Sequence, residues 1–155
     1  MVKAKSAKKK VSKAKLKKPT EKKPKVVVTR GKRKESIARA YVYEGKGVVR
    51  INGISLDGIQ SGYLKSIMTE PLILAGEKAK NLDIRVVVKG GGVMGQAEAV
   101  RTALARGIVE FSGDEELRKA MAERDRFLLL EDSRRVEPKK YLGPKARARF
   151  QKSYR

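Results

Sequence analysis

The clearest pattern along the chain is an alternation of small or aliphatic residues with larger, mostly polar ones, in residues 36–43 and 83–89. The apolar positions of these two stretches each share one face: Ala38, Ala40, Val42, Ile84, Val86 and Val88. Successive side chains of a strand point to opposite sides, so a period of two predicts two half-buried β-strands.

Shorter β-favouring runs, residues 26–29 and 48–51, predict two further strands. The basic cluster 30–34 is predicted to be a turn-like segment after the first of them. Gly45-Lys46-Gly47 can supply a hairpin turn that returns the chain into 48–51, and Asn52-Gly53 then predicts a tight turn.

A longer period appears in residues 93–111, which predict the clearest helix of the chain. Its apolar stripe consists of Ala97, Val100, Leu104, Ile108 and Phe111. An earlier helical region should begin at Ser61, a good N-cap, and should end at Gly76, with Pro71 breaking or restarting it.

A further helix is predicted at about 113–124, because Ser112 and Glu115 have the spacing of a capping box. Its expected apolar face is Leu117, Ala120 and Met121. Residues 127–130 fit either a short buried strand or a segment that docks on a helix. Strands come first and are then mixed with helices, so the predicted fold class is α+β, as a layered domain.

Charge divides the chain of 155 residues, whose net charge is +22, into three parts. Residues 1–25 hold twelve lysines and one acid, residues 133–155 hold nine basic residues and one acid, and residues 26–132 are nearly balanced. We therefore predict a disordered Lys-rich N-terminal arm, a globular RNA-binding domain and an extended basic tail. Such arms bind polyanions by releasing condensed counterions, which makes nucleic acid the first hypothesis.

Several classes of protein are disfavoured by what the sequence lacks. It has no cysteine and no histidine, so disulfides, thiolate metal sites and the commonest catalytic bases are absent. No apolar run exceeds four residues, so neither a membrane span nor a secretory signal is expected. We expect no enzyme activity, no cofactor and no metal.

The glycines of Gly90-Gly91-Gly92 and Gly95 match the spacing of a dinucleotide-binding fingerprint. The acid that this motif needs about twenty residues later is missing, because the first helical turn at 114–116 occupies that place. Acids there complement the helix dipole rather than form a carboxylate site. Two interpretations of the glycines remain open: tight packing of a strand against a helix, or contact with RNA phosphate.

The basic segments differ in chemistry. Lysines dominate the N-terminal arm and suit diffuse neutralisation or solubility. The tail interleaves arginines with Tyr141, Phe150 and Tyr154. It also carries Pro138, Gly143 and Pro144, which should keep it extended rather than helical. Arginine forks clamp phosphates and aromatic rings stack on unpaired bases, so the tail is predicted to thread between RNA helices.

Several motifs in order resemble a known family: residues 31–39, Ile51-Asn52-Gly53, Glu70-Pro71-Leu72, 83–97, and 132–141 with the ending 143–155. In this combination they are similar to the ninth protein of the small ribosomal subunit, the ribosomal protein S-nine family. The ending resembles the archaeal and eukaryotic branch. The resemblance covers about residues 26–155, and the Lys-rich arm lies outside the family pattern.

The resemblance implies the fold of the second domain of ribosomal protein S-five: a mostly antiparallel sheet with helices on one face and a left-handed β-α-β unit. It implies a cytoplasmic structural constituent of the small-subunit head that contacts small-subunit rRNA, neighbouring head proteins and peptidyl-site tRNA, with no membrane and no small-molecule substrate. The tRNA contacts would be Lys152, Ser153, Tyr154 and Arg155. The rRNA contacts would be Arg30, Lys32, Arg33, Lys34, Lys89, Gly90, Gly91, Gly92, Arg134, Arg135, Lys139, Lys140, Lys145, Arg147 and Arg149.

Two rival hypotheses stay open from the residues alone. One is a nucleoid-like protein that packs DNA with its Lys-rich arm. The other is a nucleotide-binding enzyme that uses residues 90–95.

Overall fold

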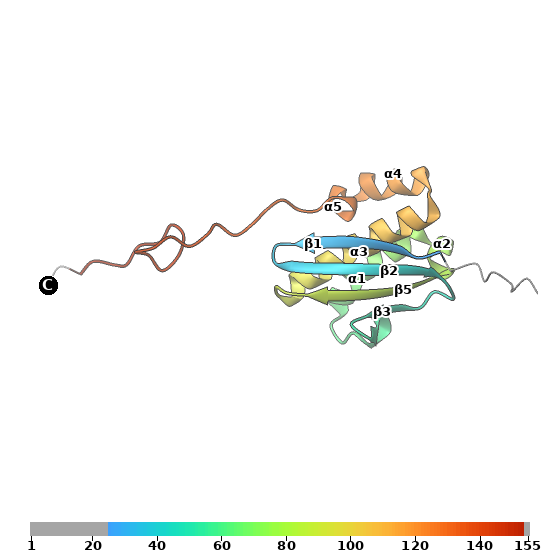
Figure 1. Cartoon of the computed structure of the whole chain (residues 1–155), viewed down its shortest axis with the longest axis horizontal. Helices are drawn as coiled ribbons and strands as arrows, with labels where there is room; N and C mark the ends of the chain where they lie inside the picture. Colours follow the sequence, from blue (N-terminus) through green and yellow to red (C-terminus); the bar gives the residue numbers. More distant parts are fainter. Residues whose placement is uncertain (1–24, 154–155) are drawn as a thin grey trace, which may run out of the picture.

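The computed structural model describes residues 25–153, which form a layered α+β body and a long tail that leaves it (Figure 1). The strands are β1 (Val27–Arg33), β2 (Ser36–Glu44), β3 (Val49–Ile51), β4 (Ile54–Ser55) and β5 (Leu82–Lys89). The helices are the 3-10 turn η1 (Leu56–Gly58), α1 (Gly62–Ala75), α2 (Glu77–Lys80), α3 (Val93–Ser112), α4 (Glu115–Arg124) and α5 (Arg126–Leu129). The predicted α+β class is confirmed.

Within residues 25–153, the five strands form one sheet in the order β1-β2-β5-β3-β4, and only the β3–β5 pair is parallel. The predicted hairpin through Gly45–Gly47 is therefore wrong, because β5 lies between β2 and β3. The loop is held at the end of β5 instead, where the Lys46 and Val48 N–H groups donate to Asp83 Oδ1 at 2.8 and 2.9 Å. These bonds lower the pKa of Asp83.

The predicted turn at 30–34 is also wrong in most of its length, since β1 continues to Arg33 and pairs with β2 as far as Ser36. Only Lys34 and Glu35 turn the chain, and Lys34 adopts a positive φ of 52°. The turn at Asn52-Gly53 is confirmed: both residues have positive φ and join β3 to β4.

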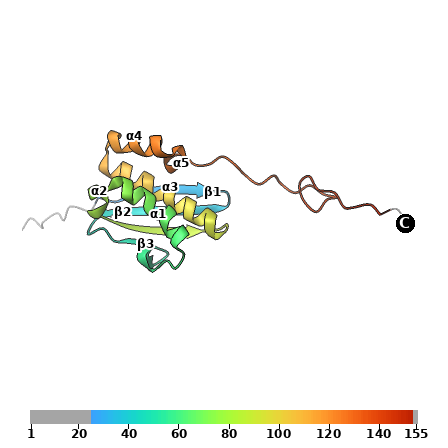
Figure 2. The ribbon, with the colours of Figure 1, turned by 180° about the vertical axis from the view of Figure 1, so that it is seen from behind.

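Helices cover one face of the sheet, with α3 across β1 and β2 and with α1 beside it (Figures 1 and 2). The alternation predicted from the sequence is confirmed, because Ala38, Ala40, Val42, Ile84, Val86 and Val88 are all buried against these helices. Small residues let the layers approach closely: a Cβ on Gly31 would overlap the backbone of α3 at Ala99 and Ala103. The core thus depends on shape as well as on apolar area.

The predicted start of α1 is confirmed, since Ser61 Oγ accepts the Leu64 N–H and Gly76 follows the last turn. The predicted break at Pro71 is wrong, because α1 runs through it. Proline removes one helical hydrogen bond, but Pro71 is fully buried among the core side chains of α1 and α3, and this packing outweighs the loss.

The predicted capping box at Ser112 is wrong as well. Ser112 Oγ donates to Ile108 O at 2.8 Å, and Asp114 caps α4 by accepting the Glu116 N–H. The ion pair with Lys78 is the main reason that the pKa of Asp114 is lowered. Leu117 and Met121 are buried as expected, whereas Ala120 is exposed. Residues 127–130 lie mostly in α5, the docking alternative.

Beyond α5 the chain leaves the body without helix or strand up to residue 153 (Figure 1). The predicted extended tail is wrong for residues 141–147, where turns and bends fold the chain into a loop and Leu142 has a positive φ of 58°. Within residues 25–153, none of the helices has the length and apolar character needed to cross a bilayer.

Replacing Gly31 with alanine should lower the free energy of unfolding by about 2–4 kcal/mol, because the new methyl group must push α3 away from β1. Urea titration followed by circular dichroism measures this. Gly62→Ala is the matched control, since nothing lies within 4 Å of its added Cβ. Equal stability of the two variants would contradict this account of the α3–β1 contact.

Candidate nucleic-acid interface

Two of the predicted RNA-contacting segments meet at one end of the body. The turn at Lys34–Glu35 joins β1 to β2, and residues 90–92 join β5 to α3 beside it (Figure 1). Ser36 Oγ donates to Gly90 O at 3.0 Å, and Ile37 is paired with Lys89 across the two strands. Ser36 and Gly90 are 54 residues apart in the sequence, and the antiparallel pairing of β2 with β5 brings the two turns together.

The glycines of this end support close packing of the two turns. Gly90 and Gly91 have positive φ values of 81° and 64°, and side chains there would overlap Glu35 and Ser36. Gly95 also faces Ser36 closely, whereas nothing lies within 4 Å of Gly92. Among residues 25–153, no strand follows α3, so the second strand that a dinucleotide site requires is missing from this part of the chain. The glycines therefore allow close packing of the two turns rather than the predicted packing of a strand against a helix, and RNA contact stays a prediction.

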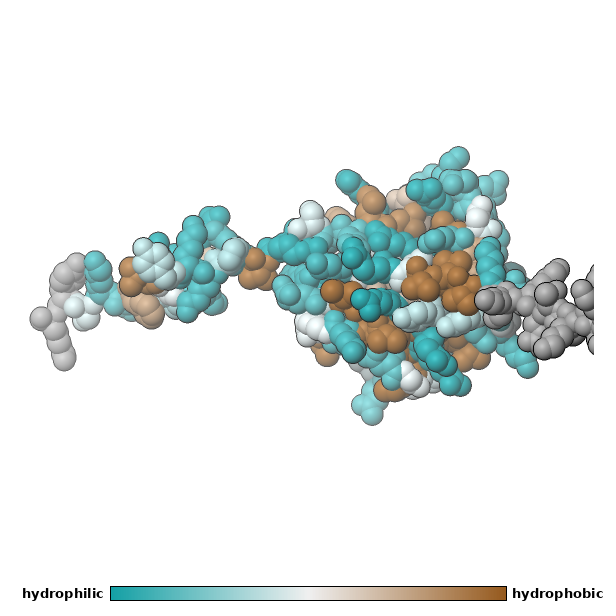
Figure 3. Space-filling model, viewed as in Figure 1, coloured by the Kyte–Doolittle hydropathy of each residue, from teal (hydrophilic) through white to brown (hydrophobic). Residues whose placement is uncertain are grey.

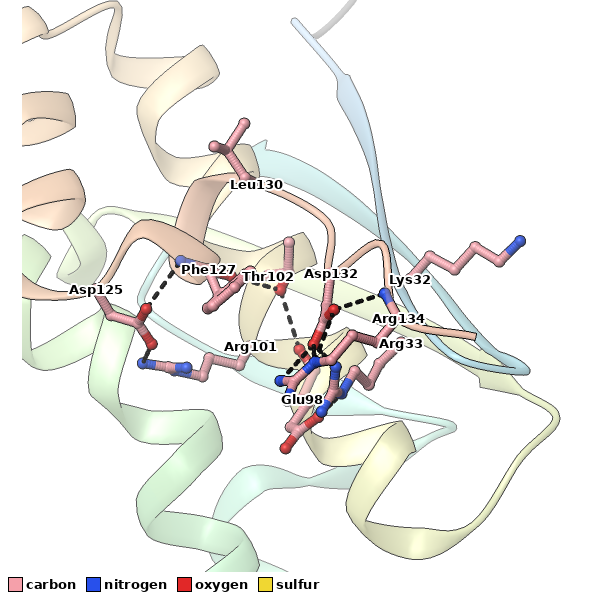
Figure 4. Close-up of a pocket in the computed structure, with 10 residues that line it drawn as sticks. All are labelled: Lys32, Arg33, Glu98, Arg101, Thr102, Asp125, Phe127, Leu130, Asp132 and Arg134. Carbon is pink, nitrogen blue, oxygen red and sulfur yellow. Dashed lines mark hydrogen bonds and ion pairs between the residues drawn. The ribbon is translucent and has the colours of Figure 1, made fainter. Parts of the chain in front are cut away.

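Four of the predicted basic contacts in this region differ in exposure and in ion pairing. Lys34 and Lys89 are exposed, and neither has a carboxylate partner within the described residues. Lys32 is half-buried and extends away from its neighbours in Figure 4. Arg30 is exposed but reaches Glu131 at 3.3 Å. These side chains supply free or weakly paired positive charge on the surface.

The fifth predicted contact in this region, Arg33, belongs to an ion-pair cluster with Glu98, Asp132 and Arg134, which we call the tail-root cluster (Figure 4). Arg33 pairs with both carboxylates, and its side chain is only 16% exposed. Arg134 grips the same Asp132 carboxylate through Nε at 2.8 Å and Nη2 at 2.7 Å, and its backbone N–H donates to Oδ1 at 2.8 Å. The charge of Arg33 is therefore balanced inside the body.

Asp132 is the centre of this cluster and is only 7% exposed. Arg135 adds a hydrogen bond from Nη1 to the Asp132 carbonyl at 2.7 Å. A buried carboxylate needs such partners, because burial without them would cost several kcal/mol. The cluster thus fixes the point and the direction in which the tail leaves the body. No role of Asp132 or Glu98 was predicted from the sequence, because no spacing rule links either residue to Arg33.

The polar edge of α3 holds the preceding segment as well. Arg101 pairs with Glu70 at 2.7 Å and with Asp125 at 2.8 Å, and Thr102 Oγ1 donates to Phe127 O at 3.2 Å. Arg106 donates to Leu129 O at 2.7 Å and also pairs with Glu131. Arg101, Thr102 and Arg106 of α3 therefore hold α5 on the body just before the tail begins.

A hollow of about 160 Å³ lies between the tail-root cluster and α5 (Figure 4). Its lining carries four basic and three acidic side chains: Lys32, Arg33, Arg101, Arg134, Glu98, Asp125 and Asp132. Most of them are already paired with one another, so the hollow offers little free charge to a ligand. These paired side chains hold the start of the tail on the body rather than forming a ligand site. Among residues 25–153, the acidic side chains nowhere gather into a group that could hold a metal ion.

The tail itself presents its charges to solvent. The predicted contacts at 135–152 are exposed: Arg135, Lys139, Lys140, Lys145, Arg147, Arg149 and Lys152. Arg147 pairs with Glu137 at 2.8 Å, a contact that is open to water. Tyr141 and Phe150 are 85% and 68% exposed, and Ser153 is exposed too. The predicted tRNA contacts Tyr154 and Arg155, and the N-terminal arm up to residue 24, lie outside the described residues.

These features define a class of protein: a small basic α+β body with an anchored, solvent-exposed cationic tail, as in proteins that assemble with RNA. The sequence profile of the family described as ribosomal protein S9/S16 matches residues 31–155. The chain therefore belongs to this family, and the family resemblance stated from the sequence is confirmed. It is a structural constituent of the small ribosomal subunit in the cytoplasm.

Similar proteins extend this result to nearly the whole body and tail. The small ribosomal subunit protein uS9 of Methanothrix thermoacetophila is 54% identical over 131 residues, which cover 84% of this chain and 99% of that protein. The uS9 of Desulfurococcus amylolyticus is 52% identical, over 84% of this chain and 94% of that protein. The uS9 of Aeropyrum pernix is 49% identical, over 84% of this chain and 97% of that protein. The archaeal character of these relatives agrees with the branch expected from the ending.

Replacing Asp132 with asparagine should lower the free energy of unfolding by about 2–4 kcal/mol, because Arg33 loses a buried partner. It should also release the root of the tail, so that trypsin cleaves faster after Arg134. Urea titration and timed digestion with mass spectrometry measure the two effects. Glu137→Gln removes an exposed pair and should change neither. Normal stability and cleavage in Asp132→Asn would contradict the anchor role.

Acid should weaken the attachment of α5 through Asp125. Burial raises the pKa of Asp125, but the Phe127 N–H and the Arg101 guanidinium outweigh it, so the pKa lies below its ordinary value. A lowered folded-state pKa adds stability above about pH 4, and this stability is lost as the pH falls through the folded value. The free energy of unfolding of Asp125→Asn should therefore fall less steeply than that of the wild type from about pH 5 to pH 2. Parallel pH profiles would count against this linkage.

Proposed function

We propose that the chain acts in the head of the small ribosomal subunit in three parts: an N-terminal Lys-rich arm, a folded body that binds rRNA, and a tail that reaches peptidyl-site tRNA. The observation that carries the proposal is the contrast across the tail-root cluster. Before Asp132, the buried and half-buried arginines are paired with carboxylates; after it, the basic side chains are exposed along a tail without helix or strand.

The rRNA part of the proposal is supported by the distribution of free charge. Lys34 and Lys89 occupy one end of the body, and the tail begins from the same end (Figure 1). A phosphate backbone that passes this end could contact the body and continue along the tail. Because each neutralised phosphate releases counterions, binding should weaken steeply with salt.

The tRNA part of the proposal rests on the family and on the anchored root. Where the tail is extended, each residue advances the chain by roughly 3.3–3.6 Å, so the tail can reach beyond the body even with the turns at 141–147. The last residues, Lys152 to Arg155, would then touch tRNA phosphates through two cations without any catalytic step. Anchoring at Asp132 reduces the entropy that is lost when the tail is ordered on RNA.

Deleting Lys152 to Arg155 should leave assembly intact but speed the dissociation of peptidyl-site tRNA several-fold, because two phosphate contacts are lost. Sedimentation after a high-salt wash measures stoichiometric retention in the small-subunit peak, and filter binding of labelled tRNA measures dissociation.

Arg118→Gln with Lys119→Gln is the matched control, since it removes the same charge from an exposed face of α4. Unchanged tRNA dissociation in the truncated subunits would overturn the tRNA role. Release of the intact chain to the top of the gradient would overturn the ribosomal proposal as a whole.

A further inference from the structure

The face of the sheet that the helices leave open carries an unusual set of side chains. Successive strand residues alternate between the two faces, so the open face is formed by the positions between the buried ones. These positions are Val28, Arg30, Lys32, Ile37, Arg39, Tyr41, Tyr43, Arg50, Asp83, Arg85, Val87 and Lys89. In Figure 3, hydrophobic patches lie among hydrophilic side chains on this side of the body.

Strand register arranges these side chains in rows across the sheet. One row is Lys32–Ile37–Lys89 and the next is Arg30–Arg39–Val87. A third runs from Val28 through Tyr41 and Arg85 to Arg50, and a fourth pairs Tyr43 with Asp83. Rows two residues apart are roughly 6.8 Å apart along the strands. The face therefore presents a repeating pattern of cations separated by aromatic or aliphatic side chains.

The charge of this face is strongly one-sided. It carries six basic residues against the single acid Asp83, whose carboxylate is occupied by backbone N–H groups of the neighbouring loop. Two pairs of arginines stand directly opposite one another, Arg30 with Arg39 and Arg50 with Arg85. Like charges in that position destabilise a sheet. Within residues 25–153, no carboxylate lies within ion-pair distance of Arg39, Arg50 or Arg85.

The aromatic residues of this face favour single-stranded over double-stranded nucleic acid as the ligand. Tyr41 and Tyr43 are half-buried on β2, and Ile37 and Val87 are each 38% exposed beside the arginines. A duplex offers its phosphates but keeps its bases stacked inside, so it would leave these rings unused. Unpaired RNA offers both phosphates and base faces, and such bases stack on aromatic residues of a sheet.

We propose that the open sheet face is a binding surface for an unpaired stretch of RNA, with bases against Tyr41 and Tyr43 and phosphates at Arg39, Arg85 and Arg50. The proposal rests on the proposed rRNA binding and assigns it a second surface. The row of Lys32 and Lys89 connects this face with the basic end of the body. A single RNA strand could therefore pass from the sheet to the turns and onto the tail.

The test uses the full-length protein and two probes, a short oligouridylate and a short RNA duplex, with affinity measured by fluorescence anisotropy at several salt concentrations. Tyr41→Leu with Tyr43→Leu should weaken binding of the single strand about tenfold or more and leave duplex binding unchanged. Arg39→Gln with Arg85→Gln should weaken both, and should reduce the salt slope for the single strand by about 1.4.

Matched controls lie on helices, away from the open face of the sheet. Tyr63→Leu removes an exposed ring from α1, and Arg118→Gln with Lys119→Gln removes two charges from α4. Neither should change the preference for the single strand. If the sheet-face variants also bind the single strand as the wild type does, the proposal is overturned.

A second measurement separates this inference from the proposed function. A photo-crosslinking residue at Val87, in small subunits that have taken up the protein, should capture RNA. Capture of a neighbouring protein would overturn the sheet-face proposal while leaving ribosomal assembly in place. Failure of the wild-type chain to enter the small subunit would overturn the proposed function on which it rests.

Discussion

The close contact of α3 with β1 is the constraint on which the rest of the structure depends. Gly31 allows the helix backbone to approach the strand, and alanines fill the narrow space between the layers. In this position, the polar side of α3 brings Glu98 to Arg33 of β1, Arg101 to Asp125 and Arg106 to Glu131. Those three side chains hold α5 and the root of the tail. The close packing of α3 on β1 therefore determines where the tail leaves the body.

The body and the tail deal with charge in opposite ways. Inside the body, arginines that could be expected to bind RNA are paired with carboxylates, as with Arg33 in the tail-root cluster. Along the tail, on the two turns and across the open sheet face, basic side chains face solvent with few partners among the described residues. Pairing gives the buried arginines a structural role and leaves the surface charges to bind a polyanion. A count of basic residues does not distinguish these two groups.

Local patterns in the sequence predicted a large part of the fold. Period-two alternation identified β2 and β5, and the helical stripe identified α3 almost to its ends. Strand order was mispredicted at Gly45–Gly47, because the insertion of β5 beside β2 depends on contacts between residues far apart in the chain. Pro71 and Ser112 were misjudged for a related reason, since burial and a competing cap at Asp114 decided the outcome. The basic segments of the candidate site were found, but Glu98 was not, since it lies 65 residues from Arg33.

The exposed charges also bear on when the protein is most stable. Opposed arginines on the sheet and a dense run of cations in the tail repel one another, and this repulsion costs stability in the free chain. RNA phosphates would remove that repulsion, and the free energy of binding would add to the free energy of folding because the folded body alone presents the charges in register. Binding would therefore add to the stability that the apolar core of the body supplies by itself. On this view the arrangement of unpaired charge couples the stability of the protein to its incorporation into the subunit.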